Sequence, residues 1–212
     1  SSGASIVEIK GDQVFQIFKS AKVAERIAKI MLNLLNENDV KYKILLQKGF
    51  GARKEILINE EIKYRAFDYI VPFEYWVKTD DIIVWKKIFT LNQLEKNKLK
   101  DFLEANWIKI LYDMLKAFYA LKRIGIIHND AVIDNIGIYN NNFVLYDFDG
   151  SGTPEEKGKD FSVDVDTFGE VGTSSSSIIS SSFSSSKESN VSSEDSLFSN
   201  PNSLFSIFFS KS

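Results

Sequence analysis

Five polar side chains that could carry out chemistry stand close together between residues 125 and 150. The stretch reads GIIHNDAVIDNIGIYNNNFVLYDFDG and contains the only histidine of the 212 residues. The polar residues are, in order, His128, Asp130, Asn135, Asp147 and Asp149. Carboxylates can accept protons, and carboxylate and amide oxygens are the ligands that Mg²⁺ prefers. The stretch is therefore either a catalytic loop with a metal-binding turn or an ordinary polar loop between strands.

The elements on either side would hold these residues in place. The preceding segment, WIKILYDMLKAFYALKR, has apolar residues at helical spacing and ends in two basic residues before Gly125, which predicts an amphipathic helix. Its apolar face comprises Trp107, Ile110, Leu111, Met114, Phe118 and Leu121. The short runs NIGIY and FVLYDF enclose three asparagines, which predicts a hairpin ending near Asp147.

The N-terminal part has strand and helix signals as well. The runs ASIVEI and VFQIFK around Lys-Gly-Asp predict a hairpin. The next segment, over residues 20–38, has a helical apolar stripe with Ser20 as its N-cap. KYKILLQ and KEILINEEI predict a second pair of strands, whereas residues 64–97 show no clear period. Together these signals predict an α+β fold.

The composition changes sharply near residue 172. From residue 174 to the end, 19 of 39 residues are serine. Such a sequence has too little apolar surface to offset the entropy lost on ordering. We expect one folded domain over residues 1–171 and a mostly disordered serine-rich tail over 172–212.

Charge and composition exclude several classes of protein. The net charge is −3, which argues against a nucleic-acid-binding face, and there is no cysteine for a disulfide or a cysteine zinc site. The sequence shows no charged segment followed by an apolar run of the kind a signal peptide has, and no apolar run of membrane-spanning length. We therefore expect an intracellular, cytoplasmic protein with neither nucleic-acid nor membrane partners.

The central stretch resembles the catalytic core of the protein kinase-like superfamily. His128, Asp130 and Asn135 match the pattern H-x-D-x-x-x-x-N of its catalytic loop, and Asp147-Phe148-Asp149 stands where the family has D-F-G. Downstream, DVDTFGEV is similar to the family's D-x-W-S-x-G segment. The resemblance spans residues 1–171, with its specific part at 104–170. It implies a bilobal fold, with a small β-rich N-lobe over about 1–70 and a minimal or truncated helical C-lobe over about 71–171.

The resemblance also implies a role for each candidate residue, with ATP as nucleotide and Mg²⁺ as metal. Asp130 would orient the acceptor hydroxyl and accept its proton, and Asn135, Asp147 and Asp149 would bind the metal. The remaining implied residues are Lys19 for the phosphates, Glu25 as its partner (Glu60 or Glu61 as alternatives), Gly3 in the glycine loop, and His128 and Asp164 as structural residues.

The chain departs from the family pattern at several points. Asn129 and Val132 stand where many protein kinases have arginine and lysine, and only sixteen residues separate Asp147 from Asp164. Activation by phosphorylation of this short segment is therefore not expected. With Asp149 as its last residue, the D-F-D motif is similar to the corresponding turn of the aminoglycoside and choline kinase branch. The family's remaining C-lobe helices are replaced by serine-rich sequence.

Three functions remain open from the sequence. The first is an ATP- and Mg²⁺-dependent protein serine/threonine kinase. The second is the same chemistry on a small-molecule hydroxyl, which the short segment and D-F-D favour. The third is a truncated pseudokinase that acts as a binding module.

Overall fold

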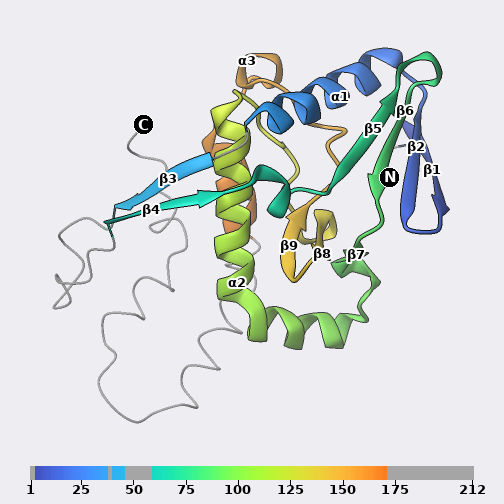
Figure 1. Cartoon of the computed structure of the whole chain (residues 1–212). Coiled ribbons are helices and arrows are strands. Elements are labelled where there is room, and N and C mark those ends of the chain that lie inside the picture. The colour runs from blue at the N-terminus through green and yellow to red at the C-terminus, as the bar shows by residue number, and fades with distance from the viewer. Residues whose placement is uncertain (1–2, 38–39, 46–58, 171–212) are drawn as a thin grey trace, which may run out of the picture.

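The computed structural model of the chain describes residues 3–37, 40–45 and 59–170 (Figure 1). Its strands and helices are β1 (Ser5–Lys10), β2 (Gln13–Phe18), α1 (Ala21–Asn36), β3 (Val40–Leu45), β4 (Asn59–Tyr64), β5 (Phe73–Val77), β6 (Ile82–Lys86), β7 (Phe89–Thr90), α2 (Lys96–Arg123), β8 (Ile136–Tyr139), β9 (Asn142–Leu145), α3 (Pro154–Lys157) and a helix over residues 162–170. Short 3-10 turns are η1 (Ala66–Asp68), η2 (Lys78–Asp80), η3 (Leu91–Gln93) and η4 (Ile133–Asn135). The expected α+β class is confirmed.

Four antiparallel strands form the largest sheet, in the order β1-β2-β6-β5. The predicted N-terminal hairpin is confirmed, and Gly11 in its turn has a φ of 63°, which glycine adopts without steric cost. Residues 73–86, from the segment without a clear period, supply the other two strands. Strands from both sides of residue 70, where the sequence predicts a boundary between two lobes, therefore belong to one sheet.

Helix α1 lies against this sheet and contacts β2 and β6. Four residues of the predicted helical stripe, Ile27, Ile30, Met31 and Leu34, are buried on this helix, together with Ala24 and Ala28. The other two residues of the predicted stripe differ, because Val23 is only partly buried and Leu35 is 45% exposed. Ser20 is the N-cap residue with extended backbone, but its side chain makes no capping hydrogen bond. Burial of the stripe, rather than a side-chain cap, therefore stabilises this helix.

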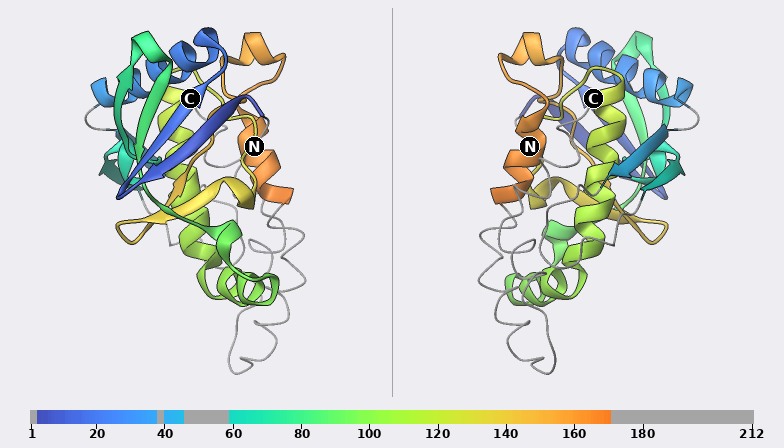
Figure 2. Two further views of the ribbon diagram at one scale, coloured as in Figure 1. Left: turned by 90° about the vertical axis from the view of Figure 1, so that its right-hand side faces the viewer. Right: turned by 90° about the vertical axis from the view of Figure 1, so that its left-hand side faces the viewer.

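Helix α2 is the longest element and passes through the centre of the molecule (Figures 1 and 2). Its predicted apolar face is buried. Trp107 stacks on Phe168 with ring centroids 5.3 Å apart, and Phe118 meets the same ring edge-on at 6.0 Å. These contacts hold the helix over residues 162–170 against α2.

The predicted hairpin before Asp147 is confirmed as β8 and β9. Asn140 and Asn141 form its two-residue turn with φ values of 49° and 64°, and asparagine tolerates this left-handed conformation better than most residues. Leu145 at the end of β9 exchanges backbone hydrogen bonds with Tyr69 and Val71. The chain just before β5 therefore fixes the strand that leads into Asp147.

The serine-rich tail expected over residues 172–212 lies outside the described residues. Within the described part of the chain, no helix is both long and apolar enough to cross a membrane.

Replacement of Phe168 by alanine is expected to lower the free energy of unfolding by about 3–5 kcal/mol, because its fully buried ring fills the space between Trp107 and Phe118. Chemical denaturation measures the change. The control is Ile108→Ala on α2, where the side chain is 45% exposed and a loss within about 0.5 kcal/mol is expected. Equal losses in the two variants would contradict this packing.

Candidate functional site

The loop after α2 is fixed by one buried carboxylate. Asp164, only 2% exposed, accepts hydrogen bonds from the backbone N–H groups of His128 at 2.8 Å and Asn129 at 2.7 Å. Asn129 has a φ of 73°, a left-handed conformation that this bonding stabilises. Burial raises the pKa of Asp164, while the two N–H groups and the charge of Lys159 act against that rise. Along the chain, Asp164 is 36 positions from His128 and 35 positions from Asn129.

The His128 side chain is fully buried and joins the loop to the turn after β9. Its Nδ1 accepts the backbone N–H of Asp130 at 3.1 Å, so Nε2 is assigned as the protonated nitrogen that donates to the carbonyl of Tyr146 at 2.9 Å. The ring meets Phe148 edge-on at 4.8 Å between centroids. Since both ring nitrogens are used within the protein, His128 is not placed to exchange protons with a ligand.

Asp130 and Asn135 are joined directly. Asn135 Nδ2 lies 2.9 Å from Asp130 Oδ2 and 2.9 Å from the Asp130 carbonyl oxygen. The backbone N–H of Tyr146 donates to the carbonyl of Asn135 at 2.9 Å, which brings the residue before Asp147 beside Asn135. The amide fixes the orientation of the Asp130 carboxylate, and its own oxygen is not used in this bond.

The turn at Asp147–Asp149 carries two carboxylates. Asp147 has a φ of 60°, and the backbone N–H of Asp149 lies 3.4 Å from Asp147 Oδ1. Burial, and then the negative charge of Asp147, raise the pKa of Asp149 above its usual range. The turn is therefore a place where negative charge is concentrated.

Two residues that the sequence did not indicate hold this turn from the other side. Gln16 Nε2 on β2 donates to Asp149 Oδ1 at 3.1 Å, and Arg26 Nη2 on α1 donates to the Asp149 carbonyl at 2.6 Å. Strand alternation could have indicated that Gln16 points inward, because it shares a strand face with the buried Phe18. No local signal could have identified Asp149 as its partner.

The N-terminal part of the chain contains the three residues predicted to bind the nucleotide, Lys19, Glu25 and Gly3. Lys19 is exposed just after β2, and its backbone N–H donates to the carbonyl of Ala4. Glu25 pairs with Lys29 at 2.9 Å, and among the described residues no hydrogen bond or ion pair joins it to Lys19. Their nucleotide roles stay predictions.

Gly3 is exposed at the start of the described chain and has a φ of 65°. The alternative glutamates, Glu60 and Glu61, lie on β4. The structure brings together Asp130, Asn135 and the Asp147–Asp149 turn around His128, and leaves Gly3 and Glu25 outside this hydrogen-bonded group.

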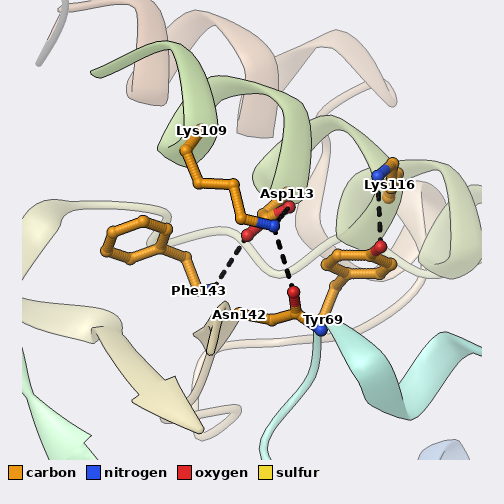
Figure 3. Close-up of polar contacts among 6 residues, drawn as sticks. All are labelled: Tyr69, Lys109, Asp113, Lys116, Asn142 and Phe143. Carbon is orange, nitrogen blue, oxygen red and sulfur yellow. Dashed lines mark hydrogen bonds and ion pairs between the residues drawn. The ribbon is translucent and has the colours of Figure 1, made fainter. Parts of the chain in front are cut away.

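A buried carboxylate on α2 anchors the hairpin that leads to the turn (Figure 3). Asp113 is fully buried, and its Oδ2 accepts the backbone N–H of Phe143 at 2.9 Å. Its Oδ1 accepts Lys109 Nζ at 3.0 Å, and the same Nζ lies 3.0 Å from Asn142 Oδ1. The start of β9 is thereby fixed to α2.

A second contact seen in Figure 3 fixes the chain that flanks the end of β9. Lys116 Nζ donates to the Tyr69 hydroxyl at 3.1 Å and lies 4.6 Å from the centre of its ring. Burial lowers the pKa of Lys116 and raises that of Tyr69. Since the Tyr69 carbonyl accepts the N–H of Leu145, helix α2 positions both ends of the strand before Asp147.

The donor set of the site fits a hard divalent cation. The amide oxygen of Asn135 and the carboxylate of Asp147 are oxygen ligands of the kind Mg²⁺ binds, and a cation there would offset the repulsion between Asp147 and Asp149. In the described part of the chain, no group of three or more histidine, aspartate or glutamate side chains is arranged to hold a metal. Mg²⁺ commonly keeps several waters and uses one or two carboxylates.

Comparison of the sequence with protein-family models and with curated proteins finds no match.

Replacement of Asp164 by alanine is expected to lower the free energy of unfolding by about 2 kcal/mol or more, because it leaves two buried N–H groups without an acceptor. Urea denaturation measures the loss. Asp166→Asn, on the exposed side of the same helix, is the control and is expected to change stability by less than about 0.5 kcal/mol. A stability loss in Asp164→Ala no larger than that of the control would contradict the anchoring role of Asp164.

Proposed function

We propose that the chain has a protein kinase-like fold. The sheet β1-β2-β6-β5 with α1 would correspond to the small lobe, and α2 with the loop, the hairpin and the helix over 162–170 to a minimal C-lobe. The proposal is supported by the way Asp164 holds the loop at His128 and by the contact of the His128 ring with Phe148.

The function proposed is transfer of the γ-phosphate of ATP to a hydroxyl group. The observation that carries it is the hydrogen bond between Asn135 and the Asp130 carboxylate, beside the strand end that presents Asp147. A fixed carboxylate next to two potential metal ligands is the minimum that phosphoryl transfer requires, because this reaction depends mainly on positioning and charge neutralisation.

In the proposed reaction, Asp130 orients the acceptor hydroxyl and accepts its proton. The acceptor oxygen forms a bond to the γ-phosphorus as the bond from phosphorus to the bridging oxygen breaks, and ADP leaves with that electron pair. Asn135 holds the Asp130 carboxylate in one orientation. Asn135, Asp147 and Asp149 would hold Mg²⁺, which neutralises charge on the phosphates when bound.

Serine or threonine of proteins is the acceptor we propose first. A small-molecule hydroxyl is a second candidate, supported by the compact path from the turn to the helix over 162–170. This path includes only the four-residue α3, and Gly152 within it pairs with Ile127 of the loop. Such a path leaves little extended chain on which a peptide could dock.

A binding module without catalysis is the other candidate, and one observation favours it. The side chain that β2 directs at the turn is the neutral amide of Gln16, which engages the Asp149 carboxylate directly. Nucleotide binding and phosphoryl transfer are therefore tested separately.

Saturating ATP with Mg²⁺ is expected to raise the melting temperature by about 5–10 °C, since ligand at a hundred times its dissociation constant stabilises the folded state by about 2.7 kcal/mol. Asp147→Asn should lose most of this shift, because it removes a metal-binding charge. The control, Asp101→Asn on the exposed start of α2, should retain it. A well-folded wild-type protein with no shift would overturn the nucleotide-binding proposal.

Asp130→Asn is expected to reduce the rate of phosphate transfer by about 10²–10⁴-fold while leaving Mg·ATP affinity within about twofold, because the carboxylate acts on the acceptor proton. Radiolabelled ATP, offered with serine/threonine peptides and separately with small-molecule alcohols, measures transfer and identifies the acceptor class. Binding without transfer to any acceptor by the wild type would favour the binding module.

A further inference from the structure

Arg26 brings a cation to the Asp147–Asp149 turn. Its Nη2 donates to the carbonyl oxygen of Asp149 at 2.6 Å, across 123 positions of sequence. Its charge also acts on the Asp149 carboxyl, where it lowers the pKa against the larger effect of burial. The guanidinium thus lies at the edge of the site that holds Asp147.

The charge of Arg26 is not compensated by a direct partner within the described part of the chain. Its one hydrogen bond there goes to a neutral carbonyl, no described carboxylate lies within ion-pair distance, and its Nε is buried without a hydrogen-bond partner. A partly buried guanidinium in this state gains free energy from an anion that accepts its remaining N–H groups. Arginine has several donors in a fixed plane and suits phosphate oxygens in particular.

The other side chain on the turn cannot supply such a charge. Gln16 is neutral, and both of its polar atoms are already bonded: Nε2 to Asp149 and to Ser5, and Oε1 to the indole N–H of Trp85. Gln16 therefore holds the turn, whereas Arg26 has N–H groups that donate no hydrogen bond within the described part of the chain.

We propose that Arg26 binds the phosphate groups of the nucleotide, in the position that the sequence resemblance gave to Lys19. The inference rests on the proposed function and names the residue that neutralises phosphate charge. The Asp147 side of the turn would then face the metal and the Arg26 side the phosphate oxygens. Lys19, by contrast, is exposed just beyond the end of β2.

Calorimetric titration of the full chain with Mg·ATP, with adenosine and with inorganic triphosphate tests this proposal. Arg26→Gln is expected to weaken Mg·ATP and triphosphate binding by about tenfold or more, since hydrogen bonds between charged groups are stronger than those between neutral ones. Adenosine affinity should stay within about twofold, because adenosine has no phosphate for Arg26 to bind. Arg26→Lys should recover part of the loss, and Lys22→Gln, an exposed charge on the same helix, is the matched control.

Three results would overturn the inference alone: unchanged Mg·ATP affinity in Arg26→Gln, equal losses for ATP and adenosine, or a loss in Lys19→Gln in place of Arg26→Gln. Equal losses would mean that Arg26 only holds the turn. Wild-type protein that binds none of the three ligands would overturn the proposed function together with this inference. If Arg26→Gln fails to fold, Arg26→Lys is tested in its place. A folded Arg26→Lys variant that keeps ATP binding, and keeps the dependence of ATP affinity on salt concentration, supports the inference. A folded Arg26→Lys variant that loses ATP binding but keeps adenosine binding overturns it.

Discussion

The carboxylate of Asp164 accepts two consecutive backbone N–H groups, from His128 and Asn129, inside the protein. A buried N–H group without an acceptor is costly, so this carboxylate makes the left-handed bend at Asn129 possible. The bend turns the chain so that the His128 ring contacts Phe148 and the Tyr146 carbonyl. Through these contacts and the hydrogen bond from the Asp130 N–H to its Nδ1, the His128 ring links the loop that carries Asp130 to the Asp147–Asp149 turn.

The turn at Asp147–Asp149 is held from two sides by parts of the chain that are distant in sequence. On one side, Asp113 and Lys116 of α2 fix the strand and the segment that lead into it. On the other, Gln16 and Arg26 bind Asp149 itself. The position of the turn therefore depends on how the four-stranded sheet and α2 are placed relative to each other. A shift of the sheet or of α2 would move the carboxylates of the turn.

Charge is distributed unevenly around this turn, and this bears on the functions proposed. Two carboxylates, of Asp147 and Asp149, and the guanidinium of Arg26 lie at this turn, a combination that suits the proposed ligand with its divalent cation and phosphate groups. The neutral Gln16 and the engaged Asp149 are also compatible with a module that binds without catalysis. The same backbone geometry can serve either function, so the side-chain charges decide between them.

The helical stripes, the two hairpins and the candidate residues between Gly125 and Gly150 could be read from the sequence, because periodicity and turn chemistry are local properties. Strands β5 and β6 could not, since β6 pairs with β2, and β5 with β6, without either strand having a clear period of its own. Gln16 and Arg26 joined the site only in the tertiary structure, 133 and 123 positions from Asp149. The sequence by itself determined which groups are available for chemistry; packing of the sheet and α1 against the turn decided which of them meet, because contacts at that separation depend on the whole fold.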